Sequence, residues 1–254
     1  MTGASPAGRH LYDRIGAGYG KHRRPDPRIA AAILDALGPA ETVVNVGAGT
    51  GSYEPAGRRV AAVEPSAAMV RQRPAGSAAA VRAAAEALPF TGGAFDAALA
   101  VLTIHHWSDW RRGLGEMRRV ARERVVILTY DAEHPGFWLV QEYFPAIREI
   151  DRRIMPPLDA VAEVLGALEV RPLPIPADCS DGFLGAYWRR PAMYLDAGAR
   201  GAISSFAALP DVEPGLARLR ADLEDGTWQR RHGGLMSREE LDIGYRLVVA
   251  EGSA

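Results

Sequence analysis

The stretch VVNVGAGTGSYE, residues 43–54, places three glycines directly after four mostly apolar residues. Glycine within a strand or helix costs conformational entropy, so Gly47, Gly49 and Gly51 need a physical reason. The usual reason is a backbone that must turn sharply or come close to a ligand. The stretch therefore predicts a buried strand that ends in a tight turn.

The segments around this turn predict an α/β fold with a Rossmann-like, mostly parallel sheet. Four apolar runs are typical of buried strands: residues 42–46, 59–64, 95–104 and 124–130. A weaker strand is expected at 78–83, and helical stretches at 65–72 and 108–122 alternate with the strands. Continuous apolar strands that alternate with helices indicate a parallel sheet covered by helices on both faces.

The regions on either side of this core complete one expected domain over residues 1–254. The alternation of strands and helices breaks down after Asp131, where Gly and Pro separate short helical stretches that we expect over the edge of the sheet. The expected divisions are cover helices at 1–38, with a Pro-started helix ending at Gly38, the core at 39–131, the helical insertion at 132–241 with a late strand at 168–176, and a final strand and tail at 242–254.

The composition narrows the class of protein. The 30 Lys and Arg against 31 Asp and Glu give a net charge of -1, which argues against nucleic-acid binding. No apolar run approaches the roughly 20 residues of a membrane span, and the N-terminus lacks a hydrophobic signal core. The single cysteine, Cys179, fits a reducing compartment. We expect a soluble, cytoplasmic protein without a membrane partner; the oligomeric state stays open.

Glu64 gives the glycine turn a second feature of a binding site. It ends the second strand, 13 residues after Gly51, where a carboxylate can accept hydrogen bonds from both hydroxyls of a ribose. Strand, glycine turn, helix, strand and acid together predict a nucleoside site at the carboxyl edge of the sheet. Dinucleotide sites have the motif G-x-G-x-x-G, whereas here Ser52 stands at the position of the third glycine. This difference favours a nucleoside without a pyrophosphate. A turn that binds nothing is the alternative.

Five segments in combination resemble the class I S-adenosylmethionine-dependent methyltransferases, in particular the small-molecule subgroup that includes ubiquinone-biosynthesis-like enzymes. The segments are YDRIGAGYGKHRRPD (12–26), VVNVGAGTG (43–51), VEPSAAMV (63–70), AAAEALPF (83–90) and FDAALAVLTIHHW (95–107). The resemblance covers roughly residues 11–131. It implies S-adenosylmethionine as cofactor, S-adenosylhomocysteine as product, and a seven-stranded sheet whose last strand is antiparallel.

The resemblance also implies roles for individual residues. The turn, Gly47, Ala48, Gly49 and Gly51, is expected under the methionine portion and the ribose. Glu64 and Pro65 are expected at the ribose, Met69 on the adenine, and Ala85 and Glu86 on the far side of the base. Tyr19 and Arg23, or Arg24 instead, are expected at the cofactor's carboxylate, which an arginine can bind bidentately.

Two positions depart from the pattern of the family. Asn45 stands where an acid is common, and Ala84 stands where an aspartate often bonds the adenine amino group. Both changes predict weaker cofactor binding or, in the alternative, a member of the fold that binds the cofactor without transferring a methyl group. A third reading of the same strand–turn–strand–acid unit is an NAD(P)-dependent oxidoreductase.

His105 and His106 end the fourth predicted strand, beside the expected position of the transferred methyl group. Histidine is the usual general base near neutral pH, and in extended chain only one of two neighbours would face the site. His106 is the preferred candidate, with a purely structural role as the alternative for either residue. The six histidines and one cysteine show no metal-ligand spacing, so no metal is expected.

The expected acceptor is a small apolar or aromatic molecule with an oxygen, nitrogen or carbon nucleophile. Aromatic and polar side chains after Asp131 form a candidate lid over it, with ordinary core packing as the alternative. The candidates are His134, Phe137, Trp138, Tyr143, Phe183, Tyr187 and Trp188.

Overall fold

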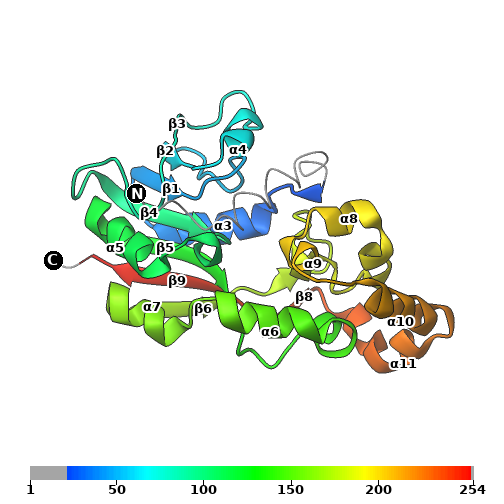
Figure 1. Cartoon of the computed structure of the whole chain (residues 1–254). Helices are drawn as coiled ribbons and strands as arrows, with labels where there is room; N and C mark the ends of the chain where they lie inside the picture. Colours follow the sequence, from blue (N-terminus) through cyan, green and yellow to red (C-terminus); the bar gives the residue numbers. More distant parts are fainter. Residues whose placement is uncertain (1–21, 253–254) are drawn as a thin grey trace.

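The computed structural model describes residues 22–252, and a seven-stranded sheet forms its centre (Figure 1). Its strands are β1 (Thr42–Val46), β2 (Arg59–Val63), β3 (Ala80–Val81), β4 (Phe95–Val101), β5 (Ala121–Tyr130), β6 (Leu168–Pro172) and β9 (Tyr245–Glu251). The strand order is β3-β2-β1-β4-β5-β9-β6, and β9 is antiparallel to both neighbours while the other pairs are parallel. This confirms the predicted fold class. A separate pair, β7 (Ile175–Pro176) and β8 (Glu240–Leu241), is antiparallel.

Helices surround this sheet. The α-helices are α3 (Pro27–Leu37), α4 (Ala67–Arg71), α5 (Trp110–Val120), α6 (Pro145–Ile154), α7 (Leu158–Leu165), α8 (Ala197–Gly201), α9 (Ser204–Ala207), α10 (Glu213–Glu224) and α11 (Thr227–His232). The 3₁₀ turns are η1 (Ile104–His106), η3 (Leu184–Tyr187), η4 (Pro191–Leu195) and η5 (Gly233–Ser237), and η2 (Leu139–Tyr143) is a π-helical turn. In Figure 1, α8–α11 gather at the right, on the side toward which β5 points.

The sheet has a packed core on each face because successive side chains of a strand point to opposite faces. Val43 of β1 belongs to the core that contains Ile33 of α3. Its neighbour Val44 belongs to the other core, with Leu114 of α5 and Val161 of α7. The core on the α3 side continues into the aromatic residues of the C-terminal insertion, so the insertion packs on the sheet directly.

The boundaries of α3 follow from its sequence. The buried Asp26 side chain accepts a hydrogen bond from the Arg28 N–H at 3.0 Å, and Pro27 occupies the first helical position. Gly38 ends the helix with φ of 54°, a conformation that glycine adopts without steric cost. The Pro-started helix is therefore where the sequence predicts it. The first helix expected within 1–38 lies outside the described residues.

Several predicted elements differ from the structure. The helix expected after the glycine turn is absent from the described segment 47–58, because glycines with positive φ at Gly47, Gly49, Gly51 and Gly57 hold it in turns. The strand predicted at 95–104 ends at Val101. The strand predicted at 168–176 breaks after Pro172 into β6 and β7, and the final strand begins at Tyr245.

Candidate active site

The glycine turn lies against the ends of two neighbouring strands. The N–H groups of Gly47 and Ala48 donate to the Val63 carbonyl at 2.9 and 3.0 Å, which folds the turn back onto β2. Gly47 has φ of 72°, and a Cβ atom there would lie 2.3 Å from Thr103 Oγ1. Only glycine therefore fits at position 47, because both the backbone and the adjacent end of β4 exclude a side chain.

Glu64 is held in one orientation at the end of β2. Its Oε2 accepts a hydrogen bond from the Gly49 N–H at 2.9 Å, and its Oε1 accepts one from the Ser66 N–H at 2.8 Å. The residue is 7% exposed. Burial raises the pKa of Glu64, and the two backbone donors oppose this effect. The carboxylate is thus oriented by the glycine turn itself, and it lines the cavity described next.

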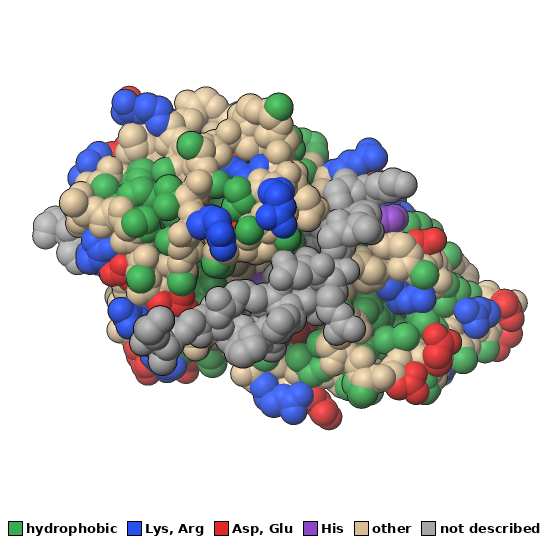
Figure 2. Space-filling model, turned by 45° about the horizontal axis from the view of Figure 1, so that its top comes forward, with side chains coloured by type: hydrophobic (Ala, Val, Ile, Leu, Met, Phe, Trp, Pro, Cys, Tyr) green, Lys and Arg blue, Asp and Glu red, His purple; other side chains and the backbone are tan. Residues whose placement is uncertain are grey.

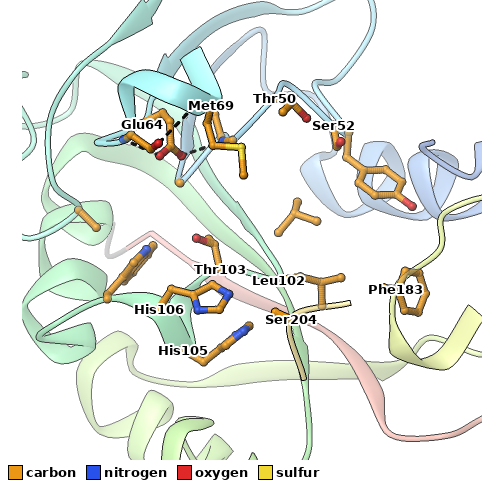
Figure 3. Close-up of a pocket in the computed structure, with 18 of the residues that line it drawn as sticks. Thr50, Ser52, Glu64, Met69, Leu102, Thr103, His105, His106, Phe183 and Ser204 are labelled. Atoms are coloured by element: carbon orange, nitrogen blue, oxygen red, sulfur yellow. Dashed lines mark hydrogen bonds between the residues drawn. The ribbon is translucent and has the colours of Figure 1, made fainter. Parts of the chain in front are cut away.

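A cavity opens at the carboxyl ends of β1, β2, β4 and β5. Figure 3 shows Glu64 and Met69 on one side of it, His105 and His106 beside one another below, and Phe183 at the far end. Of the predicted site residues, those that line this cavity are Arg23, Gly47, Ala48, Gly49, Glu64, Pro65, Met69, Ala85, Glu86, His105 and His106. Gly51 does not line it, because it faces the Arg73 side chain instead. Tyr19 lies outside the described residues.

Arg23 enters the cavity from the N-terminal segment, and Arg24 does not. The Arg23 Nε donates to Asp181 Oδ1 at 2.5 Å, and the Tyr53 hydroxyl donates to Asp181 Oδ2 at 3.0 Å. Arg24 is exposed and is not among the residues that line the cavity. Of the two arginines left open by the sequence, the structure therefore brings Arg23 to the site. The ion pair with the buried Asp181 holds its guanidinium at the cavity wall.

Glu86 has a structural task besides lining the cavity. Its Oε1 accepts hydrogen bonds from the Ser108 hydroxyl at 2.7 Å and the Asp109 N–H at 3.0 Å. Burial alone would raise the pKa of Glu86, but these hydrogen bonds outweigh it and lower the pKa. The carboxylate thus ties the loop after β3 to the start of α5 and stays ionised at neutral pH.

Both histidines line the cavity, contrary to the expectation that at most one faces it. The reason is local: the chain turns into η1 at Ile104 instead of continuing extended, so neighbouring side chains share one side. Their ring centroids lie 3.9 Å apart. Burial lowers the pKa of His106 to about 4, with a contribution from the charge of Arg23. Burial and the neighbouring His106 hold the pKa of His105 well below its usual value.

The far half of the cavity contains residues that the sequence did not single out. It is formed by the segment after β4, the end of β5, α6, η3, the start of α9 with the residue before it, and the start of β9. The members missed are Leu102, Thr103, Tyr130, Asp151, Met155, Leu184, Ile203, Ser204, Ser205 and Tyr245. They come from segments distant in sequence, so no local motif marks them. Only Leu102 and Thr103 lie within one of the segments that resemble the family, residues 95–107.

Of the aromatic lid candidates, Phe183 alone lines this cavity. Five others belong to the hydrophobic core: Phe137, Trp138, Tyr143, Tyr187 and Trp188. Their polar atoms are used internally; for example, the Trp138 indole donates to the Trp188 carbonyl at 2.9 Å. His134 lies 3.7 Å from Asp242, outside the cavity. Core packing, the alternative left open by the sequence, therefore holds for the five aromatic residues.

The half of the cavity next to the glycine turn, here called the near half, fits a nucleoside. Glu64 offers an oriented carboxylate, Met69 and Ala85 offer apolar surface, and a Cβ at Gly49 would meet nothing within 4 Å. Asn45 is buried beside the turn, and its Nδ2 has no hydrogen-bond partner within residues 22–252. A buried donor without a partner is costly, so a bound ligand would supply the missing acceptor.

Within residues 22–252, no three His, Cys, Asp or Glu side chains are grouped so that they could hold a metal ion. In the same part of the chain, no helix has the length and apolar character needed to cross a bilayer. On the face shown in Figure 2, blue basic and red acidic side chains are scattered among apolar ones.

Comparisons with known proteins agree with this geometry. Residues 44–129 match the family described as "Methyltransferase domain". A crystal structure from Anabaena variabilis, of a protein assigned as a methyltransferase of an antibiotic biosynthesis pathway, is 37% identical, with a TM-score of 0.83 and coverage of 90% of this chain and 98% of that one. No curated protein matches the chain.

More distant structures share the fold. Phosphoethanolamine N-methyltransferase 2 of Haemonchus contortus, solved with S-adenosyl-L-methionine, is 15% identical with a TM-score of 0.56, over 98% of this chain and 58% of that one. The cyclase SpnF is 15% identical with a TM-score of 0.57, over the full length of both chains. Likeness at this level of identity concerns the fold.

The chain belongs to the class I S-adenosylmethionine-dependent methyltransferases. It is a methyltransferase, and its cofactor is S-adenosylmethionine. This confirms the activity and the cofactor that the resemblance of the five sequence segments implies.

Proposed function

We propose that this enzyme transfers the methyl group to an oxygen, nitrogen or carbon atom of a small organic molecule that occupies the far half of the cavity. The observation that carries the proposal is that Glu64 and the aromatic rings of Tyr130, Phe183 and Tyr245 line the same cavity. A nucleoside held at Glu64 leaves the aromatic half for a second molecule. Such mostly apolar, concave sites suit small ligands, here an acceptor with an apolar or aromatic body.

The residues of the near half take the cofactor in this proposal. Glu64 accepts hydrogen bonds from the ribose hydroxyls, Met69 and Ala85 pack on the base, and Pro65 borders the ribose. Gly47, Ala48 and Gly49 pass close to the ribose and the methionine portion. Arg23 faces the carboxylate, with Tyr19 as a second contact, while Gly51 and Glu86 shape the turn and the start of α5.

The chemistry needs little from the protein beyond alignment. S-adenosylmethionine supplies a methyl group bound to a positively charged sulfur. A nucleophile can attack the methyl carbon directly and displace the sulfur. We propose that His105 and His106 form the wall next to that methyl group. Because both pKa values are depressed, both imidazoles are neutral at pH 7, and a neutral ring nitrogen can accept a hydrogen bond from the acceptor and orient it.

Two further features support a small-molecule enzyme of the cytoplasm. The near-neutral net charge and the scattered charges of Figure 2 do not suit a nucleic acid. The only cysteine, Cys179, is buried, and burial raises its pKa to about 12, which fits a thiol in a reducing compartment. A dinucleotide is disfavoured because the described segment 47–58 has no helix whose N-terminus could face a pyrophosphate.

The proposal is tested by replacing Glu64. We expect Glu64→Ala to weaken S-adenosylhomocysteine binding by about tenfold or more, because the ribose hydroxyls lose a charged acceptor. Glu41→Ala is the matched control, since the Glu41 side chain is exposed and distant from the cavity lining. Calorimetric titration measures both, with NADH as a second ligand.

The acceptor class is tested separately with methyl-labelled cofactor. We expect label in the small-molecule fraction of a cell extract and none in its protein or nucleic-acid fraction. Label in the macromolecular fraction would contradict the proposal. Tight cofactor binding with no label transfer to any fraction would favour a non-methylating member of the fold.

A further inference from the structure

The far half of the cavity contains a buried carboxylate to which the proposed function gives no role. Asp151 lies on α6, is 3% exposed, and lines the cavity. Within residues 22–252 its side chain makes no hydrogen bond and no ion pair, although Arg148 lies one turn earlier on the same helix. Burial, without a compensating partner, raises the pKa of Asp151 to about 7.

Aromatic rings surround the same part of the cavity. Tyr130 and Tyr245 are partners across β5 and β9, with ring centroids 5.3 Å apart, and Phe183 lies 4.8 Å from Tyr245. The pKa of Tyr130 is raised to about 12, mainly by burial and secondly by the negative charge of Asp151. The charge of Asp151 also contributes to the raised pKa of Tyr245. The carboxylate and both phenol rings therefore lie within electrostatic reach of one another.

The charges that line the cavity leave Asp151 as its uncompensated group. Glu64 and Glu86 each accept backbone N–H donors, and Arg23 is paired with Asp181. Arg23 is the one Lys or Arg side chain among the described residues that line the cavity. A lone buried carboxylate is stabilised most by a cation that brings its own charge and hydrogen-bond donors. The negative faces of aromatic rings favour the same kind of ligand.

We propose that Asp151, with the rings of Tyr130, Phe183 and Tyr245, forms a subsite for a protonated basic nitrogen, so that the methyl acceptor is an amine with an apolar body. This rests on the proposed function. The ammonium group pairs with the Asp151 carboxylate and gives it one proton: an N–H bond breaks, an O–H bond forms, and the nitrogen keeps the electron pair. Asp151 thus both selects the substrate and prepares its nucleophile.

The test compares two size-matched probes, benzylamine and benzyl alcohol, by calorimetry on the full chain saturated with S-adenosylhomocysteine, at about pH 8 so that Asp151 is ionised. We expect the native protein to bind benzylamine at least about tenfold more tightly than benzyl alcohol. Asp151→Asn keeps the shape and should abolish this preference. Glu149→Gln removes an exposed acid of the same helix and should leave the preference intact.

The outcomes separate this inference from the proposed function. Equal affinities on the native protein, or a preference that survives Asp151→Asn, would overturn the amine subsite. A loss of S-adenosylhomocysteine affinity in Asp151→Asn would also overturn it, because the carboxylate would then serve the cofactor. Failure of the native protein to bind S-adenosylhomocysteine counts against the proposed function instead. In that case the affinities for benzylamine and benzyl alcohol are measured on the protein without S-adenosylhomocysteine. Equal affinities there would overturn the amine subsite.

Discussion

At the scale of single residues, Gly47 joins the fold to the site. The φ of 72° and the contact of a built Cβ with Thr103 are separate obstacles to any other side chain. We expect Gly47→Ala to destabilise the protein by about 3 kcal/mol, the sum of a backbone cost of about 1 and an overpacking cost of about 2. Chemical denaturation measures this change.

Gly57→Ala is the control for the backbone cost alone. Gly57 has φ of 77°, and a Cβ there would meet nothing within 4 Å. We expect a loss of about 1 kcal/mol at this position. Equal losses of stability in Gly47→Ala and Gly57→Ala would show that Thr103 moves aside. The contact between Thr103 and a Cβ atom at position 47 would then cost no free energy.

Asp151 makes stability depend on pH. Its folded pKa of about 7 lies above the unfolded value of 3.8, so the folded state binds more protons between these limits. Stability contributed by protonated Asp151 is present below about pH 4 and is lost as the pH rises to about 7. Tyr130 and Tyr245 stay neutral throughout this range. We expect Asp151→Asn to be more stable than the native protein at pH 8, by roughly 2–4 kcal/mol.

Thermal or urea unfolding at several pH values tests this prediction. The advantage of Asp151→Asn should shrink as the pH falls from about 7 toward 4, and Glu149→Gln should show no such trend. The depressed pKa values of His105 and His106 act oppositely, since their contribution is lost as the pH falls below about 6.5. The comparison of each variant with the native protein removes this shared background. An Asp151→Asn variant that is less stable than the native protein at pH 8 would contradict the prediction.

The two acids of the site differ in how far the sequence reveals them. Glu64 is predictable because a strand, a turn and a short distance in sequence fix its position. Asp151 is not, because α6 could present several faces to the sheet. Only the packing of α6 near Tyr130 and Tyr245, residues far apart in sequence, makes it a cavity residue.

Among the helices, two caps that look alike in sequence differ in how much they are expected to stabilise the protein. The Asp26 side chain accepts a hydrogen bond from a backbone N–H at the start of α3. The Asp109 side chain does the same at the start of α5. Asp26 is 0% exposed and also accepts from the Ser180 N–H and the Arg28 guanidinium. Burial would raise the pKa of Asp26, but these partners lower it to about 2.

We therefore expect Asp26→Ala to cost about 2–3 kcal/mol and Asp109→Ala about 1 kcal/mol. The Asp26 contribution should be complete above about pH 4 and should disappear as the pH falls toward 2, since its folded pKa lies below its unfolded value. Urea titration at neutral and acidic pH measures both variants. Equal costs at the two positions would show that the buried bonds of Asp26 add nothing to its capping role.

The elements themselves are predicted well where burial alone decides them. β1 has the bounds that the apolar run gives, because a strand buried on both faces must be apolar throughout. The segment after the turn is not a helix, since several left-handed glycines favour turns. β4 ends before the histidines because the chain enters η1 there. Such ends depend on local backbone geometry that an apolar run does not encode.

At the scale of the whole molecule, the site is where the core and the C-terminal insertion meet. The cofactor half comes from the ends of β1 and β2, which the sequence marks by motif. The half that we propose for the acceptor comes from the segment after β4, β5, α6, η3, the start of α9 and β9, which the fold brings together. The sequence therefore predicts the activity and cofactor, while the residues that we propose for the acceptor are brought together only by the fold.

We propose that one cavity binds the nucleoside at Glu64 with the sulfur of the cofactor directed toward the histidines and Asp151. A crystal structure of the chain with S-adenosylhomocysteine would locate both groups. We expect both ribose hydroxyls within hydrogen-bond distance of the Glu64 carboxylate, and the sulfur between the glycine turn and the aromatic half. A nucleoside bound away from Glu64, or a sulfur facing away from Asp151, would rule out this arrangement.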